Sequence, residues 1–108
     1  NAGFHMFVNI AKKKLQGQDV GFASKLKLKF ENVGCVLFDG TSGGVIDIST
    51  EDSEANATIS MSLDTFGKIQ SKELDFMSAM GEQLITIDGD MAVLMGGMPK
   101  IMKKMEEG

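Results

Sequence analysis

The sequence has no Arg, Trp or Tyr, and it has only one Cys, one His and one Pro. Without Arg, the bidentate contacts that proteins make to phosphate and guanine are missing, and the net charge of -4 also argues against nucleic acid as a partner. Because Cys35 has no partner for an internal disulfide, we expect a reducing compartment, the cytoplasm. His5 and Cys35 together supply neither a common zinc site nor a Cys–His catalytic pair. We therefore expect no catalytic residues, no metal, no cofactor and no enzymatic activity.

Long hydrophobic runs and ligand-binding loops are also missing. The charge-free stretch 91–99 is much shorter than the roughly 18–20 residues of a membrane span. The glycines at 40, 43 and 44 lack the Gly-Lys-Ser/Thr ending of a phosphate loop and predict a hairpin turn. The acidic segment 47–54 lacks the central glycine of a calcium loop, so we expect a solvated loop. Cys35 lies in an apolar strand pattern, which predicts an inert buried thiol.

The apolar residues that are present include nine Met and seven Phe among 108 residues. Met is unbranched and polarizable and fills irregular space, and Phe carries no hydrogen-bonding group. This composition suits a loose, apolar interior better than a polar catalytic cleft. The length suits one domain, which we expect to comprise residues 3–108, with Asn1 and Ala2 as a cloning remnant.

The charges are distributed unevenly along the chain. Up to Phe30 there are six lysines and one acid, a net charge of +5, whereas the remainder carries -9, which gives the total of -4. A basic face could touch anionic lipid headgroups weakly, at roughly 1 kcal/mol per lysine near the surface. The alternative is that these lysines only solvate a helix and a strand.

Hydrophobic periodicity predicts the order of the elements. Spacing of three and four residues predicts a helix over 4–15, and alternation predicts strands over the next segments. Ser62 or Asp64, Asp75 and Asp90 are suited to cap three later helices. The predicted strands are 25–30, 33–38, 45–48, 57–61 and 84–87, and the last helix is 91–105. The fold class is α+β: a single domain with a five-stranded, mainly antiparallel sheet covered on one face by helices.

The last predicted helix carries a ladder of methionines. Met91, Met95, Met98, Met102 and Met105 are spaced 4, 3, 4 and 3 residues apart, and Leu94 and Ile101 widen this stripe. The stripe either packs on the protein's own sheet as core, or lines a space filled by a ligand or another subunit. Gly96, Gly97 and Pro99 each disfavour a helix, by roughly 1 kcal/mol per glycine and about 3 kcal/mol for proline. We therefore expect a helix that is kinked or frayed near its middle, either as a flexible lid over an apolar cavity or as a kinked core helix.

The second half of the chain resembles the sterol carrier protein-2 family. The resemblance rests on the strand 57–61 (Ala-Thr-Ile-Ser-Met), on Phe66 and Ile69, on Ser78-Ala79, and on the run 85–91 (Ile-Thr-Ile-Asp-Gly-Asp-Met). It covers roughly residues 57–105, and the Gly89-Asp90-Met91 turn is its most specific part. Lys72 and Gln83 stand where this family usually has glycine.

This resemblance implies a non-catalytic domain with an apolar tunnel between helices and sheet, which binds a fatty acyl chain, a sterol or an isoprenoid, with transfer as an option. The alternatives are an interaction or dimerisation module that uses the methionine-rich helix, and an accessory domain that presents a lipid to a partner enzyme. The residues that the resemblance implies for the tunnel are Phe66, Ile69, Leu74, Met77, Met80, Ile85, Ile87, Leu94, Met95, Met98 and Met102.

Overall fold

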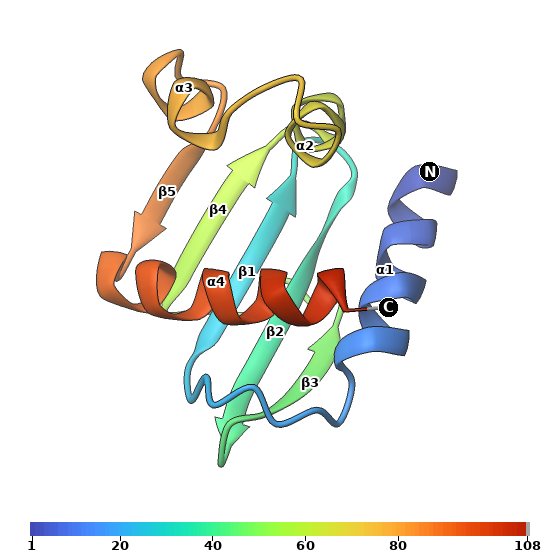
Figure 1. Ribbon diagram of the computed structural model, residues 1–108, viewed down its shortest axis with the longest axis vertical. Coiled ribbons are helices and arrows are strands. Elements are labelled where there is room, and N and C mark those ends of the chain that lie inside the picture. Colours follow the sequence, from blue (N-terminus) through green and yellow to red (C-terminus); the bar gives the residue numbers. More distant parts are fainter. Residues whose placement is uncertain (108) are drawn as a thin grey trace.

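One mixed sheet carries four helices on one of its faces (Figure 1). The computed structural model describes residues 1–107, and Gly108, the last residue of the predicted domain, lies outside them. The strands lie in the order β3-β2-β1-β4-β5, and only β1 and β4 are parallel. The predicted α+β class and the mainly antiparallel five-stranded sheet are confirmed. The elements are α1 (Ala2–Leu15), β1 (Lys25–Phe30), β2 (Gly34–Ser42), β3 (Val45–Ser49), β4 (Ala57–Met61), α2 (Leu63–Gln70), α3 (Phe76–Gly81), β5 (Thr86–Gly89) and α4 (Met91–Glu106).

Alternation along the strands separates the two faces of the sheet. Leu26, Leu28 and Phe30 of β1 are buried under the helices. Their neighbours in β2 and β4 point to the same side, since Leu28 pairs with Val36 on one strand and Ile59 on the other. Ile59 in turn pairs with Ile87, which places β5 as a continuation of the apolar surface. The core therefore lies between this face and the helices.

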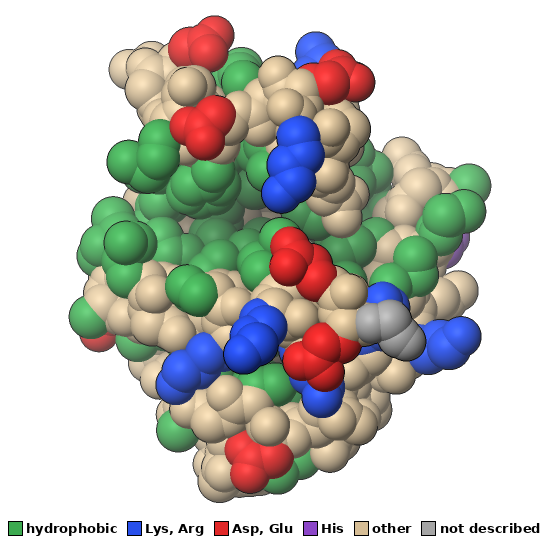
Figure 2. Space-filling view, in the orientation of Figure 1, with side chains coloured by type: hydrophobic (Ala, Val, Ile, Leu, Met, Phe, Trp, Pro, Cys, Tyr) green, Lys and Arg blue, Asp and Glu red, His purple; other side chains and the backbone are tan. Residues whose placement is uncertain are grey.

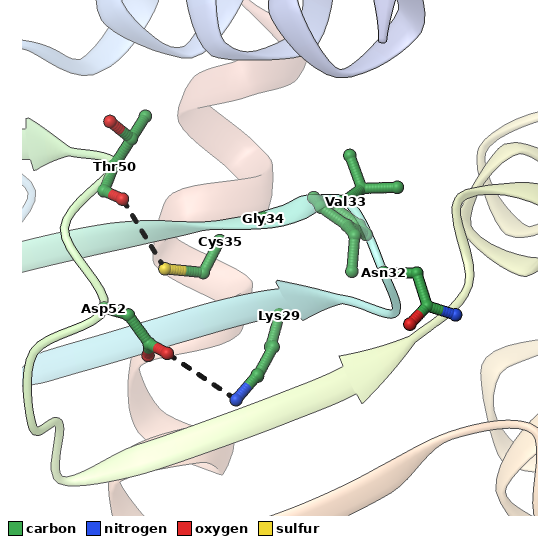
Figure 3. A pocket seen from close by; sticks show the side chains of 8 residues that line it. Lys29, Asn32, Val33, Gly34, Cys35, Thr50 and Asp52 are labelled. Atoms are coloured by element: carbon green, nitrogen blue, oxygen red, sulfur yellow. Dashed lines mark hydrogen bonds and ion pairs between the residues drawn. The ribbon is translucent and has the colours of Figure 1, made fainter.

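The loop between β3 and β4 crosses the opposite face of the sheet. In Figure 3 it passes from Thr50 through Asp52 across β2 and β1. Lys27 projects from β1 into this crossing and donates to the carboxylate of Asp52 at 2.7 Å and to the Ser53 carbonyl at 2.8 Å. The acidic segment was expected to be a solvated loop: residues 47–49 belong to β3 instead, and the loop that follows is largely exposed but is also tied to the sheet, because a buried lysine needs a charged partner.

Cys35 lies on the same face and is buried, as predicted. Its Sγ lies 3.5 Å from the Glu51 carbonyl oxygen and 3.7 Å from that of Thr50. Burial, and secondarily the charge of Asp52, raise the pKa of the Cys35 thiol above its ordinary value. A thiol whose pKa is raised carries little thiolate and is a weak nucleophile.

The outer edge of β3 is covered by the segment that follows α1. The Gly17 N–H donates to the Ile46 carbonyl at 2.8 Å, and the Ile46 N–H donates to the Gln18 carbonyl at 2.9 Å. The Gln16 side chain continues this pairing, since its Oε1 accepts from the Ile48 N–H at 2.7 Å. The N–H groups of Ile46 and Ile48 and the Ile46 carbonyl are thus satisfied by the chain itself, whereas β5 ends the sheet on the other side.

The last helix is continuous from Met91 to Glu106, with Pro99 inside it, so the fraying expected at its middle is not present. Gly97 is buried against Phe22, and a Cβ at this position would overlap the Phe22 ring. Gly96 faces open space, with no atom within 4 Å of such a Cβ. The two glycines therefore differ: Gly97 allows Phe22 to pack against α4, which periodicity could not reveal.

The turn that enters α4 has the geometry that the sequence predicts. Gly89 has a φ of 101°, and a Cβ there would overlap the carbonyl of Asn56. Asp90 caps the helix, accepting from the Ala92 N–H at 2.8 Å and the Val93 N–H at 3.3 Å. At the N-terminus of the chain, Asn1 caps α1 by accepting from the Phe4 N–H at 3.1 Å.

Other element boundaries differ from the sequence prediction mostly by one or two residues, and those of β2 and β5 differ most clearly. β2 continues to Ser42, so the hairpin turn is shorter than expected. β5 comprises Thr86–Gly89 and not 84–87, because Ile85 is buried in the core before the chain joins β4.

Candidate functional site

Helix α4 packs on the sheet through a narrow seam and turns its methionines to one side. Its buried residues are Leu94, Gly97 and Ile101, which are three and four residues apart. At 3.6 residues per turn, the methionine stripe is centred roughly a quarter turn from this seam. Met98, Met102 and Met105 are half-buried on that flank, and Met91 and Met95 are exposed. The stripe is thus neither the core contact of α4 nor fully solvated.

The opposite flank of α4 fixes the direction in which the stripe faces. Lys100 lies on that flank and donates to the Gly21 carbonyl at 3.0 Å. Gly21 belongs to the connection between α1 and β1, on the side of α4 remote from α2 and α3 (Figure 1). The methionine flank therefore faces α2 and α3. Figure 2 shows apolar side chains gathered in a hollow between α4 and these two helices.

The second wall of this hollow is the segment α2–α3, which sequence signals hold in place. Ser62 caps α2 by accepting from the Thr65 N–H at 3.0 Å, and Asp75 caps α3 by accepting from the Ser78 N–H at 3.1 Å. Phe66 anchors α2, because its ring centroid lies 4.9 Å from that of Phe7 and 5.1 Å from that of Phe30. Aromatic pairs at such distances are stabilising. This cluster joins α2 to α1 and β1.

We call the hollow between α4 and α2–α3 the apolar groove. The eleven residues predicted to line a tunnel fall into three groups by burial. Three are buried in the core: Phe66, Ile85 and Leu94. Six are half-buried: Ile69, Leu74, Met80, Ile87, Met98 and Met102. Met77 and Met95 are exposed, at 70% and 69%.

Three further apolar residues, on α3, before β5 and on α4, were not among those predicted. Phe76 of α3 is half-buried and packs against the core, while Leu84 and Met91 are exposed. Met91 belongs to the methionine stripe, so its spacing was the available signal. Leu84 precedes β5 and lies in the apolar run 84–87 that was predicted to be a strand. No sequence signal indicated that the Leu84 side chain would be exposed.

The wall helix α2 carries an exposed ion pair, Lys68 with Asp64 at 3.3 Å, whereas the groups with shifted pKa values lie elsewhere on the molecule. The shifted pKa values within residues 1–107 belong to Cys35, Asp39 and Asp52, which are on β2 and the β3–β4 loop. Hydrogen bonds from Thr41 lower the pKa of Asp39, and those from Lys27 lower that of Asp52. Figure 2 shows mainly apolar side chains in the hollow, so apolar contact is the main interaction that the groove offers.

Two other depressions are present on the surface. One of about 190 Å³ lies on the far face of the sheet, beside Lys29, Cys35 and Asp52 (Figure 3). The other, shallow and about 560 Å³, lies on the outer side of α1 beside Met6 and Ile10. Neither contains any of the predicted lining residues.

The six lysines of the basic N-terminal part do not share one face. Lys12, Lys13 and Lys14 lie on α1, whereas Lys25, Lys27 and Lys29 project from the far face of the sheet. Lys14 donates to the carbonyl of Met105 at 2.9 Å and to that of Glu107 at 2.8 Å, so it holds the end of α4. The continuous basic face considered from the sequence is therefore not formed.

Within residues 1–107, no group of three or more His, Cys, Asp or Glu side chains is placed to hold a metal ion. In the same part of the chain, no helix has both the length and the apolar character needed to cross a membrane.

Solved structures share this fold over most of the chain. Sterol carrier protein 2 from Yarrowia lipolytica, in its apo form, superposes with a TM-score of 0.74 at 8% identity, covering 94% of this chain and 91% of that one. The sterol carrier protein domain 2 of Helicoverpa armigera gives a TM-score of 0.68 at 12% identity, with 98% and 91% covered. These identities are low, so the likeness concerns the fold.

A third similar structure belongs to a much longer protein. The sec-alkylsulfatase Pisa1 from Pseudomonas sp. matches with a TM-score of 0.61 at 20% identity, over 84% of this chain but only 15% of the enzyme. The chain thus spans a small part of that relative.

Among curated proteins, the sequence has no match. The family model of the SCP-2 sterol transfer family, however, matches residues 31–99, which is more than half of the chain and includes β2 through most of α4. This match agrees with the fold and with the turn at Gly89 and Asp90. The protein belongs to the SCP-2 sterol transfer family.

Proposed function

We propose that this domain binds the apolar part of a lipid, a fatty acyl chain, sterol or isoprenoid, in the apolar groove without catalysing a reaction. The observation that carries the proposal is the hollow between α4 and α2–α3, with methionines on one wall and apolar residues of α2 and α3 on the other (Figure 2). Family membership supports lipid binding in general. The proposed site is an open groove whose floor includes Ile87, in place of the enclosed tunnel expected from the sequence.

The energetics of such a site are favourable without specific polar contacts. Burying a methylene contributes roughly 0.8 kcal/mol, so a chain of about 16 carbons gains up to about 12 kcal/mol before association and ordering costs of several kcal/mol. Micromolar affinity is within this range. Flexible methionine side chains adapt to differently shaped apolar ligands, so broad specificity is expected.

The test is binding of a fluorescently labelled fatty acid, together with native mass spectrometry of gently purified protein. Met98 is half-buried on the groove side of α4, so Met98→Asp should weaken binding at least tenfold by placing a charge against the ligand. Met6→Asp is the matched control, because Met6 lies on the outer side of α1 and the change should leave affinity unaltered. Equal affinities for the wild type and Met98→Asp would contradict the proposed site.

A second candidate is an accessory domain that presents a lipid substrate to an enzyme. It is supported by the likeness to a 15% portion of the alkylsulfatase, in which a domain of this fold is part of a larger chain. The sedimentation coefficient of the isolated domain, measured with and without loaded fatty acid, shows whether copies of the domain associate. A dimer that dissociates in Met98→Asp, while fatty acid uptake is unchanged, would favour pairing of copies over lipid binding.

Two further proposals concern membrane contact and the cellular compartment of the protein. We propose weak contact with anionic membranes through the outer side of α1, where Met6 and Ile10 are exposed near Lys12 and Lys13. We also propose a reducing compartment such as the cytoplasm, which the free thiol of Cys35 supports. Sedimentation with vesicles rich in phosphatidylserine tests the first, since high salt should abolish the contact.

A further inference from the structure

The methionines of this protein differ greatly in exposure. Met77 of α3 is 70% exposed and Met95 of α4 is 69% exposed, and these two helices stand on opposite sides of the apolar groove. Met6, on the outer side of α1, is 64% exposed. Met61 of β4 is only 2% exposed, within the core. The chain thus carries exposed thioethers on both wall helices of the proposed site, an exposed one remote from it and a protected one.

An exposed thioether is readily oxidised by hydrogen peroxide. The sulfur attacks one peroxide oxygen, the O–O bond breaks, and the sulfur becomes a sulfoxide while the other oxygen leaves as water. The thioether loses two electrons and the peroxide gains them. Methionine sulfoxide reductases reverse the change with thiols as reductant, forming a disulfide and water. The product is polar, whereas the starting side chain is apolar.

We infer that Met77 and Met95 form a reversible oxidation site that lowers the affinity of the groove for apolar ligands; the inference rests on the function proposed above. A ligand in the groove covers these side chains and removes them from water. Covering a sulfoxide costs the hydration of its oxygen, since the groove walls are apolar around it. Oxidation on both walls therefore opposes ligand binding from both sides.

The fold itself does not depend on these two side chains. Helix α4 is held by Leu94, Gly97 and Ile101, and α3 is held by Ala79, all of which are buried. A sulfoxide on Met77 or Met95 remains in solvent in the unliganded protein. Oxidation here changes binding and not folding, unlike oxidation of a core methionine such as Met61.

The test measures binding of a fluorescently labelled fatty acid before and after treatment with hydrogen peroxide, with sulfoxides located by peptide mass spectrometry. Met77, Met95 and Met6 should be oxidised while Met61 is spared, and affinity should fall about tenfold, which corresponds to about 1.4 kcal/mol. Reductase treatment should restore it. Met77→Leu/Met95→Leu should keep its affinity after peroxide, while the control Met6→Leu should lose affinity as the wild type does.

Several outcomes would overturn the inference. One is full affinity in wild-type protein carrying sulfoxide at both Met77 and Met95, and another is equal loss of affinity in Met77→Leu/Met95→Leu. Loss of the far-ultraviolet circular dichroism signal on oxidation also counts against it, because the fold must survive. Absence of fatty acid binding by the reduced wild type has a different meaning: it overturns the proposed function, and the inference with it.

Discussion

Replacing the two neighbouring glycines of α4 with alanine, one at a time, should move stability in opposite directions. A Cβ at position 97 would lie 2.5 Å from Cδ1 and 2.9 Å from Cζ of Phe22, and closer still to Cε1. Carbon atoms in favourable contact are about 3.5–4.0 Å apart. Because Phe22 is only 5% exposed, its ring has little room to retreat. The helix or the ring must therefore move by about 1 Å.

The expected magnitude follows from two opposing effects. Overpacking of a well-filled core costs typically 1–3 kcal/mol, and exchanging glycine for alanine within a helix returns about 1 kcal/mol. Gly97→Ala should therefore lower the free energy of unfolding by up to about 2 kcal/mol. Gly96→Ala meets no atom within 4 Å, so it keeps only the helical gain of about 0.5–1 kcal/mol. Because the helical gain is common to both, the two variants should differ by the overpacking cost, about 1–3 kcal/mol.

Urea denaturation followed by circular dichroism measures this difference, and an unchanged m-value would show that compactness is preserved. In a domain of this size, 1 kcal/mol corresponds to a shift in Tm of about 4–8 °C. Phe22→Leu in the Gly97→Ala background should recover part of the loss, giving a coupling energy in a double-mutant cycle. The reasoning is refuted if Gly97→Ala is as stable as Gly96→Ala, or if Phe22→Leu has its full cost in both backgrounds.

Two further predictions concern backbone strain and charge. Lys72 and Gln83, with φ of 68° and 62°, occupy the left-handed region, so Lys72→Gly and Gln83→Gly should each raise the free energy of unfolding by about 1 kcal/mol. Gln70→Gly, at a helical position of α2, should lower it in the same urea assay, and the opposite pattern would count against left-handed strain. The hydrogen bond from Lys27, with the lysine charges, lowers the pKa of Asp52 below its ordinary 3.8, so this carboxylate stabilises the fold above that pH and the contribution is lost as pH falls below it. Asp52→Asn should therefore be less stable than the wild type at pH 7, with a difference that shrinks below pH 3.8; a difference independent of pH would contradict this role for the ion pair.

The element order and the fold class could be predicted because each strand and helix of this chain carries its own signal. Alternation identified the buried face of β1, and the caps at Asp75 and Asp90 were recognisable from residue type and spacing. The position of β4 beside β1 was not predictable in this way. Parallel pairing joins residues such as Leu28 and Ile59, which are distant in the sequence, and periodicity carries no information about such neighbours.

The candidate site was predicted in part, for a related reason. The methionine stripe was visible from spacing, but periodicity alone placed the centre of the apolar face among the methionines. In the structure the buried seam of α4 includes Gly97, which no hydrophobicity pattern counts as core. The buried side of the helix is therefore rotated away from the methionine stripe, and Met95 is exposed. The glycines expected to loosen the helix have different roles, and only the contact of Gly97 with Phe22 shows this.

The covering of the β3 edge by Gly17 and Gln18 bears on how copies of this protein could associate through their sheets. Growth of a fibril by strand addition requires two free edges per copy, so that each new copy offers a place for the next. Within residues 1–107, this sheet has a free edge at β5 alone. Edge-to-edge pairing would therefore stop at two copies, joined through β5. The short segment after α1 prevents further copies from adding at the β3 edge.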